Sequence, residues 1–297
     1  MKITKIFTIA ISMALIAVLF QSCEKDDLNE SLEVQTVDAV VTQTTSREPV
    51  TDREILNKVA TLNIDIGQVT KGDYHLPDGS VEQRIFIGDD IVVTEQVLDE
   101  MLKLGSLEQN RQYRTNFLVT GSNRTIDILG YTGNDQFGLS NKARTALGWA
   151  VNNYNRLSGV SLNFRLTFGT NFNAADMVVY DNSSNNSGSG GVAGFPTAQG
   201  RPHKFIQIFN LDGFSTNVNE HVITHEIGHS VGFRHSDWFD RFSCGSGGGE
   251  SAGSTGAIHV PGTPTGRDTT SIMNACFSNS ENGEFNGNDI TALRNMY

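Results

Sequence analysis

The segment HEIGHSVGFRH places three histidines and a glutamate at a spacing that could hold a metal ion beside a catalytic base. Residues four apart lie on one face of an α-helix, so His225 and His229 can offer ring nitrogens to the same ion while Glu226 projects beside them. Gly232 predicts the end of this helix, because glycine enters a left-handed turn without a Cβ clash. That turn would bring His235 back to the ion as a third ligand.

Three protein ligands leave one coordination position of a zinc ion open, which distinguishes catalytic from structural zinc sites. Water held at that position is acidified toward neutrality and becomes a nucleophile, with Glu226 as its general base. A bare H-E-x-x-H also occurs by chance on helices whose histidines are solvated or packed in a core. The longer form, with its glycine and third histidine, favours a zinc hydrolase.

The extended motif resembles that of the metzincin metallopeptidases, in which a methionine turn follows later in the chain. SIMN at 271–274 is similar to that turn, and the resemblance implies that Met273 lies beneath the histidines as a hydrophobic floor. HEIGH, RHSD, VPGTPTG and SIMNACF most resemble the bacterial dual-action HEIGH metallopeptidases, over Gln112–Tyr297. The last segment is also similar to the final helix of matrixins, our second choice. Ala275 stands where astacins and serralysins carry a tyrosine ligand, so we expect none here.

The resemblance implies an α/β (α+β) zincin-like catalytic domain over residues 117–297, with a mixed sheet and an active-site helix. It also implies a zinc-dependent endopeptidase acting on proteins or peptides, in which Glu226 passes a proton from the water to the leaving amine. An antiparallel edge strand would pair with extended substrate, and the stretch Gly191–Thr197 is our candidate. Two alternatives remain: a surface lipoprotein that uses this fold to bind host or matrix ligands, and a protease acting mainly on its own propeptide.

The spacing of apolar residues predicts the elements of the catalytic domain. We expect strands at 124–129, 161–167, 176–180 and 204–209, and helices at 140–157 and 217–231. His221 lies one turn before His225 on the same helix face, and because the ligand set is already complete we predict a packing or capping role. Asp237, two residues after the third histidine, resembles the family's residue there, and its role stays open.

Residues 49–116 predict a small α+β unit, which ahead of a protease domain resembles a propeptide. Thr51 is expected to cap a first helix, and strands at 84–87 and 91–94 flank a Gly88-Asp89 turn before a second helix. The sequence FIGD is similar to the F-x-G-D element of astacin propeptides, which implies that Asp89 displaces the catalytic water. A simple Gly-Asp hairpin turn is the alternative.

An activating cut is expected in an exposed linker around Arg111, Arg114 and Arg124. A cysteine switch is excluded, because the expected propeptide contains no cysteine.

Residues 1–22 have the features of a secretory signal peptide: a basic start and an apolar run at 6–20 that is too short to span a membrane. LFQSC resembles a lipobox, which implies that Cys23 becomes an acylated N-terminus; a chance cysteine is the alternative. The acidic EKDD that follows resembles a signal for export to the outer face of the outer membrane. We therefore expect an exported outer-membrane lipoprotein with residues 23–48 as a flexible tether, and the acidic segment favours its display on the cell surface.

Cys244 and Cys276 remain if Cys23 is lipidated, and an even number in an exported chain suggests one disulfide between them. A second zinc site is less expected, since neither lies in a C-x-x-C pair. The oxidising compartment disfavours two reduced thiols.

The chain has 297 residues and a net charge of −11, enough length for one sizeable domain and a smaller one. An acidic surface argues against nucleic acid or anionic lipid as a partner, and we expect a monomer. Asp181 and Asp212 lie in polar loops and could help bind Ca²⁺, as matrixin loops do, although isolated loop aspartates usually cap turns.

Overall fold

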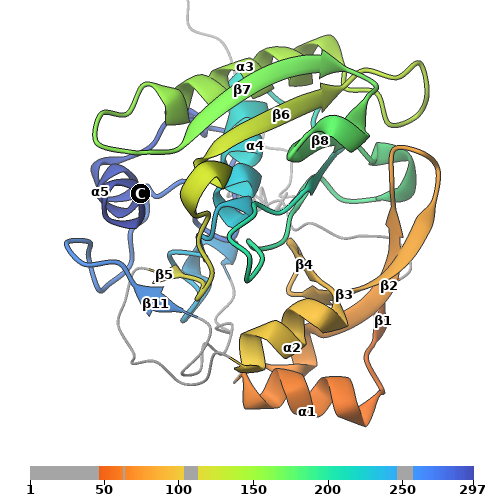
Figure 1. Cartoon of the computed structure of the whole chain (residues 1–297), viewed down its shortest axis with the longest axis vertical. Coiled ribbons are helices and arrows are strands. Elements are labelled where there is room, and N and C mark those ends of the chain that lie inside the picture. The colour runs from red at the N-terminus through yellow and green to blue at the C-terminus, as the bar shows by residue number, and fades with distance from the viewer. Residues whose placement is uncertain (1–46, 63, 104–112, 246–256) are drawn as a thin grey trace, which may run out of the picture. The chain divides into compact units, whose positions relative to one another are not determined.

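The computed structural model describes residues 47–62, 64–103, 113–245 and 257–297 (Figure 1). The expected signal peptide, Cys23 and nearly all of the expected tether lie outside these ranges. Within them, no helix combines the length and apolar character needed to cross a bilayer.

Residues 47–103, here called the N-terminal unit, contain one antiparallel sheet and two helices. The sheet has the order β1 (Glu48–Pro49), β2 (Val69–His75), β3 (Val81–Ile87) and β4 (Ile91–Val93), with helices α1 (Arg53–Thr61) and α2 (Glu95–Lys103). Asp52 caps α1, because its carboxylate accepts hydrogen bonds from the backbone N–H groups of Glu54 and Ile55. The expected cap, Thr51, is therefore one residue early.

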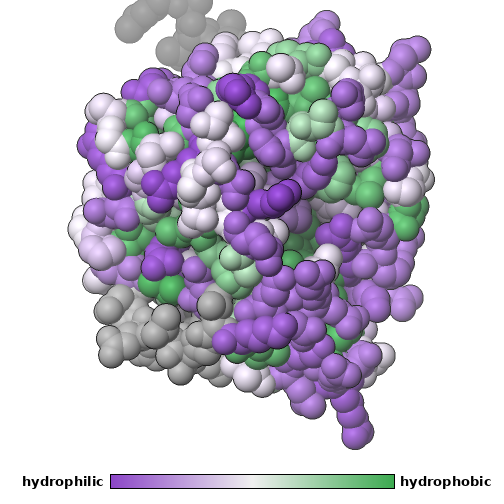
Figure 2. All heavy atoms as spheres, in the orientation of Figure 1, coloured by the Kyte–Doolittle hydropathy of each residue, from purple (hydrophilic) through white to green (hydrophobic). Residues whose placement is uncertain are grey.

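Both helices of this unit are amphipathic, and each buries its apolar stripe against one face of the sheet. Ile55 and Val59 from α1 and Leu98 and Met101 from α2 share a core with the sheet. Figure 2 shows mainly hydrophilic residues over the region where these two helices lie. The opposite face of the sheet is also apolar, and it packs against the catalytic part of the chain.

The second sheet has five strands and carries the mixed topology that the sequence predicts. Its order is β7 (Asn163–Gly169), β6 (Thr125–Tyr131), β8 (Met177–Asp181), β10 (Phe205–Phe209) and β9 (Gly190–Val192). The first four strands are parallel, and β9 pairs antiparallel with β10 at the edge. The predicted α/β class with a mixed sheet is confirmed, and β9 overlaps the start of the expected edge strand.

Alternating residues of these strands separate two cores, as the period of a β-strand requires. One face carries Ile126, Ile128 and their neighbours, and packs against α3 (Asn141–Asn155), α4 (Thr216–Ser230) and α5 (Gly287–Met296) (Figure 1). Every residue of α4 from Val218 to Ser230 is buried, so this helix crosses the interior. A helix buried on all sides lacks a single apolar stripe, so the spacing of its apolar residues is only a weak indication of a helix.

A short two-stranded sheet joins β5 (Tyr113–Arg114) to β11 (Ile258–His259). Residues 113–116 fall within the expected propeptide but lie with the catalytic part of the chain. Of the three arginines expected near an activating cut, Arg114 is in β5 and Arg111 is outside the described ranges.

Candidate active site

The three histidines converge on one point at the end of α4. The Nε2 atoms of His225 and His229 are 2.9 Å apart, and Nε2 of His235 is 3.1 Å from that of His229. Gly232 has a φ of 112°, the positive value that the sequence predicts for the turn between helix and third histidine. A Cβ at this glycine would lie 2.9 Å from the carbonyl oxygen of Phe117, which further restricts the position.

The hydrogen bonds on the far side of the rings determine which nitrogens face each other. Nδ1 of His225 donates to the carbonyl of Ile272 at 2.8 Å, and Nδ1 of His229 donates to the carbonyl of Phe233 at 2.9 Å. A carbonyl only accepts, so each Nδ1 carries the proton and each Nε2 presents a lone pair. Buried lone pairs this close repel each other unless a cation lies between them. The donor set therefore fits a metal ion.

A carboxylate completes the cluster, and it comes from the turn between β3 and β4. Oδ2 of Asp90 lies 2.7 Å from Nε2 of His235 and 3.5 Å from Nε2 of His225. One ligand atom from each of Asp90, His225, His229 and His235 falls within 4.8 Å of the others. Burial would raise the pKa of Asp90, but the positive charge of His235 beside it holds that pKa well below its usual value.

Asp89, the residue expected at the metal, does not face the histidines. Its carboxylate lies 3.3 Å from Nη2 of Arg241, and its carbonyl accepts a hydrogen bond from Arg47. Both aspartates lie in the turn between β3 and β4, and their carboxylates face different partners: Asp89 faces Arg241 and Asp90 faces the histidines. The carboxylate beside the three histidines is therefore that of Asp90, one residue later in the chain than expected.

Glu226 occupies the side of the cluster next to β9. Gly191 makes this close approach possible, since a Cβ there would lie 2.6 Å from Oε1 of Glu226. Oε2 is buried and has no hydrogen-bond partner among the described residues. Burial, and then the charge of Asp90, raise the pKa of Glu226 well above its ordinary value. A carboxylate with an unused oxygen beside a metal site suits proton transfer to or from a water.

The main chain of the N-terminal unit also covers the edge next to β9. The N–H of Val92 donates to the carbonyl of Ala193 at 2.8 Å, and the N–H of Ala193 donates to the carbonyl of Asp90 at 2.9 Å. Ile91 and Ala193 pair in parallel orientation. The turn thus supplies a carboxylate to the histidines, and β4, which follows it, pairs with the sheet edge.

Comparison with known families agrees with this geometry. The model of a family described as dual-action HEIGH metallo-peptidase matches residues 85–297. The chain belongs to this family. It is therefore a metallopeptidase, as predicted, and the match begins before Gln112 and includes Asp90.

Two solved structures of myroilysin are similar to this metallopeptidase at 14% and 15% sequence identity. Each alignment covers 60% of this chain, with 82% and 86% of the respective myroilysin chains and a TM-score of 0.38. No curated protein matches the chain.

The methionine turn of the metallopeptidase lies against the active-site helix at Gly228. A Cβ at this glycine would lie 2.6 Å from Sδ of Met273, so a larger residue would displace the methionine. The carbonyl of Ile272 in the same turn orients His225. Met273 is thus buried close to the histidines, where the resemblance places a floor.

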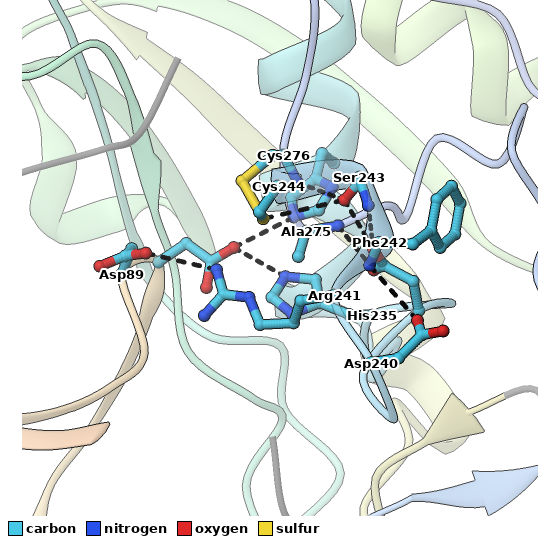
Figure 3. Close-up of a disulfide and its surroundings, with 12 residues drawn as sticks. Asp89, His235, Asp240, Arg241, Phe242, Ser243, Cys244, Ala275 and Cys276 are labelled. Carbon is cyan, nitrogen blue, oxygen red and sulfur yellow. Dashed lines mark hydrogen bonds and ion pairs between the residues drawn. A yellow bond between two sulfur atoms is a disulfide. The ribbon is translucent and has the colours of Figure 1, made fainter. Parts of the chain in front are cut away.

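Behind the third histidine, a loop is tied to the methionine turn by hydrogen bonds and a disulfide (Figure 3). The buried Asp237 accepts hydrogen bonds from the backbone N–H groups of Ala275 and Ser243 and from the Ser243 hydroxyl. Asp237 therefore fixes the loop in place by hydrogen bonds, a role that the sequence alone does not determine. Cys244 and Cys276 form the predicted disulfide.

Arg241 extends from this loop toward the N-terminal unit (Figure 3). It pairs with Asp89, while Arg47 donates to the carbonyl of Asp89 from the other side. Sequence reasoning missed Arg241, because no local pattern links the two segments.

The loop aspartates considered for calcium act as local hydrogen-bond acceptors. Asp181 accepts from the backbone N–H of Ser183, and Asp212 accepts from the hydroxyl of Ser140. Neither belongs to the group of metal-ligating side chains found in the described ranges.

Proposed function

We propose that this metallopeptidase is a zinc-dependent endopeptidase in which Glu226 is the general base. The observation that carries the proposal is the convergence of buried imidazole lone pairs on one point, next to an oxygen of Glu226 that has no hydrogen-bond partner in the described part of the chain. Three imidazoles and an open position are the donor set of catalytic zinc.

His225, His229 and His235 would hold the ion, which when bound supplies a Lewis acid and acidifies water. The carbonyls of Ile272 and Phe233 keep two of the imidazoles in the ligating tautomer. Glu226 accepts the proton of the attacking water and returns it to the leaving amine. Extended substrate would add a strand beside β9, using main-chain hydrogen bonds.

We further propose that the protein is made as an inactive precursor, with Asp90 as the inhibitory residue. Its carboxylate lies among the three histidines, where it would take the coordination position that water needs. Asp90 and Val92 also hydrogen-bond to Ala193, so the N-terminal unit lies along the edge that substrate would use. Both obstructions come from the turn between β3 and β4 and from the start of β4, and removing the N-terminal unit would remove them together.

The catalytic role is tested by Glu226→Gln in the activated protein. We expect zinc content near one per chain and loss of peptide hydrolysis by at least about 1,000-fold, because the metal ligands remain while the base is lost. Elemental analysis and a fluorogenic peptide assay measure the two effects. Glu220→Gln is the matched control, since this glutamate is buried on the same helix but accepts a hydrogen bond from Asn153. Turnover at the wild-type rate in Glu226→Gln would refute the assignment.

The inhibitory role is tested by comparing Asp90→Asn with Asp89→Asn in the intact precursor. Asparagine keeps the shape of the side chain but binds metal more weakly, so Asp90→Asn should hydrolyse peptides without a lag. Asp89→Asn should retain most of the lag, because Asp90 still faces the histidines. Progress curves report the lag, and electrophoresis verifies that the precursor is uncut. Equal lags in the two variants would contradict the proposal.

We also propose that the protein is exported and anchored in the outer membrane through a lipid on Cys23. The proposal rests on the signal-like start and the lipobox-like LFQSC. Cys23→Ser should move the protein from the membrane fraction to the soluble fraction of the exporting cell. Unchanged fractionation would refute the anchor.

A further inference from the structure

A small pocket lies next to Glu226, between α4 and the segment that follows Met273. Its walls include Val222 of α4 together with Ala275 and Phe277. Asp90 and Glu226 also line it, so the pocket adjoins the place where a peptide bond would be cleaved. With the N-terminal unit in place, its volume is about 20 Å³, which is room for about one water molecule.

His221 lines this pocket and has an unused hydrogen-bonding atom. The residue is 5% exposed, and its Nε2 has no hydrogen-bond partner among the described residues. Nδ1 lies 3.7 Å from a carboxylate oxygen of Glu281, which favours the tautomer with the proton on Nδ1. Burial lowers the pKa of His221 to about 3, so the ring is neutral. Nε2 is therefore a hydrogen-bond acceptor in a site where the sequence predicts only packing or capping.

Asn274 adds a donor to the same pocket. Its Oδ1 accepts a hydrogen bond from the hydroxyl of Ser236 at 2.8 Å, so the NH₂ group of the side chain remains for another partner. An acceptor and a donor between apolar walls match a side chain that can both donate and accept. An anionic side chain would be buried beside the carboxylate of Glu226, and a purely apolar one would leave Nε2 of His221 without a partner.

We propose that His221 is a specificity-determining residue, which makes the enzyme prefer a small, neutral, hydrogen-bonding side chain next to the cleaved bond. Serine, threonine and asparagine have this chemistry. The inference rests on the proposed peptidase function, since the pocket is defined by its position beside Glu226. It adds the class of substrate side chain that the site selects.

The test compares peptides that differ only in threonine against valine at each position flanking the cleaved bond. These side chains have nearly the same shape, so their ratio isolates the hydrogen bond. The full-length protein is loaded with zinc and activated by limited proteolysis. At one flanking position, kcat/KM should favour threonine by at least about tenfold, because a site built to bond a hydroxyl discriminates strongly against its absence. His221→Leu should bring this ratio close to one, while His221→Gln should restore part of it.

Three results would overturn the inference. A wild-type ratio near one at every position would do so, and this measurement stands even where His221→Leu fails to fold. A preference that persists in folded His221→Leu would assign the selection to other residues. Absence of any Glu226-dependent cleavage, with zinc bound, would instead refute the proposed function on which the inference rests.

Discussion

Asp289 is a buried carboxylate that connects α5 to the methionine turn. It accepts hydrogen bonds from the hydroxyl of Ser271 and the backbone N–H of Ile272, and it forms a capping box with Asn286 at the start of α5. Because the carbonyl of Ile272 orients His225, Asp289 supports the position of His225 indirectly, through Ile272. Burial is the largest influence on this group, and it raises the pKa of Asp289 to about 6.

This raised pKa predicts how stability changes with pH. Between pH 3.8 and about 6 the folded protein binds more protons at Asp289 than the unfolded chain does. The contribution of Asp289 to the free energy of unfolding therefore falls as pH rises through this window, by roughly 3 kcal/mol at most. Asp289→Asn removes the titration. Urea unfolding in the presence of a chelator should show a larger advantage of wild type over the variant at about pH 4.5 than at about pH 7. A pH-independent difference would contradict the assignment.

At the scale of elements, the loop after His235 depends on the Cys244–Cys276 disulfide and on Asp237. The bridge spans a sequence separation of 32 residues and joins this loop to the segment after Met273. It therefore stabilises two parts of the site that local hydrogen bonds alone would hold less firmly.

Replacing both cysteines of the bridge by serine should lower the free energy of unfolding by about 3 to 4 kcal/mol, because the unfolded chain regains loop entropy. Urea unfolding with and without reductant measures the change, and the variant should no longer respond to reductant. Cys23→Ser is the matched control, since it removes a cysteine outside the bridge. A wild-type free energy of unfolding in the double variant would show that the bridge adds no stability.

At the scale of the whole molecule, the N-terminal unit and the catalytic part share two buried apolar clusters. Tyr74 and Phe86 from the N-terminal unit pack with Val192 and Phe209 from the second sheet. Phe195 lies in the core formed with α1 and α2. Removal of the N-terminal unit would expose these side chains, so the unit contributes to folding as well as covering the site.

A chain that begins at Tyr113 should therefore refold with a lower yield and bind more of a hydrophobic dye than the chain that includes residues 47–103. Adding the separate N-terminal unit during refolding should raise the yield, since it covers the apolar surface again. Recovery of soluble, zinc-binding protein measures the effect. An unrelated acidic domain of similar size serves as the control. Equal yields with and without the unit would show that the catalytic part folds independently.

The sequence alone determined the features that depend on short separations along the chain. His225, Glu226 and His229 share one helix, and Gly232 and His235 follow within one turn, so helical period and glycine geometry are enough to predict their grouping. The strands of the second sheet are also local patterns, and each begins within two residues of its expected start. When Cys23 is excluded, only two cysteines remain in the sequence, so the pairing of Cys244 with Cys276 could be predicted from the number of cysteines.

Only the tertiary structure decided which distant side chains meet these residues. Asp90 and His235 are separated by 145 residues, and the choice between Asp89 and Asp90 depends on the direction in which the chain enters β4 beside β9. From the sequence His221 is expected to be a core histidine, and only the packing of the segment after Met273 shows that it lines a pocket. Periodicity states which face of an element is apolar, but not which other element covers that face, because packing partners are selected by the fit of the whole chain.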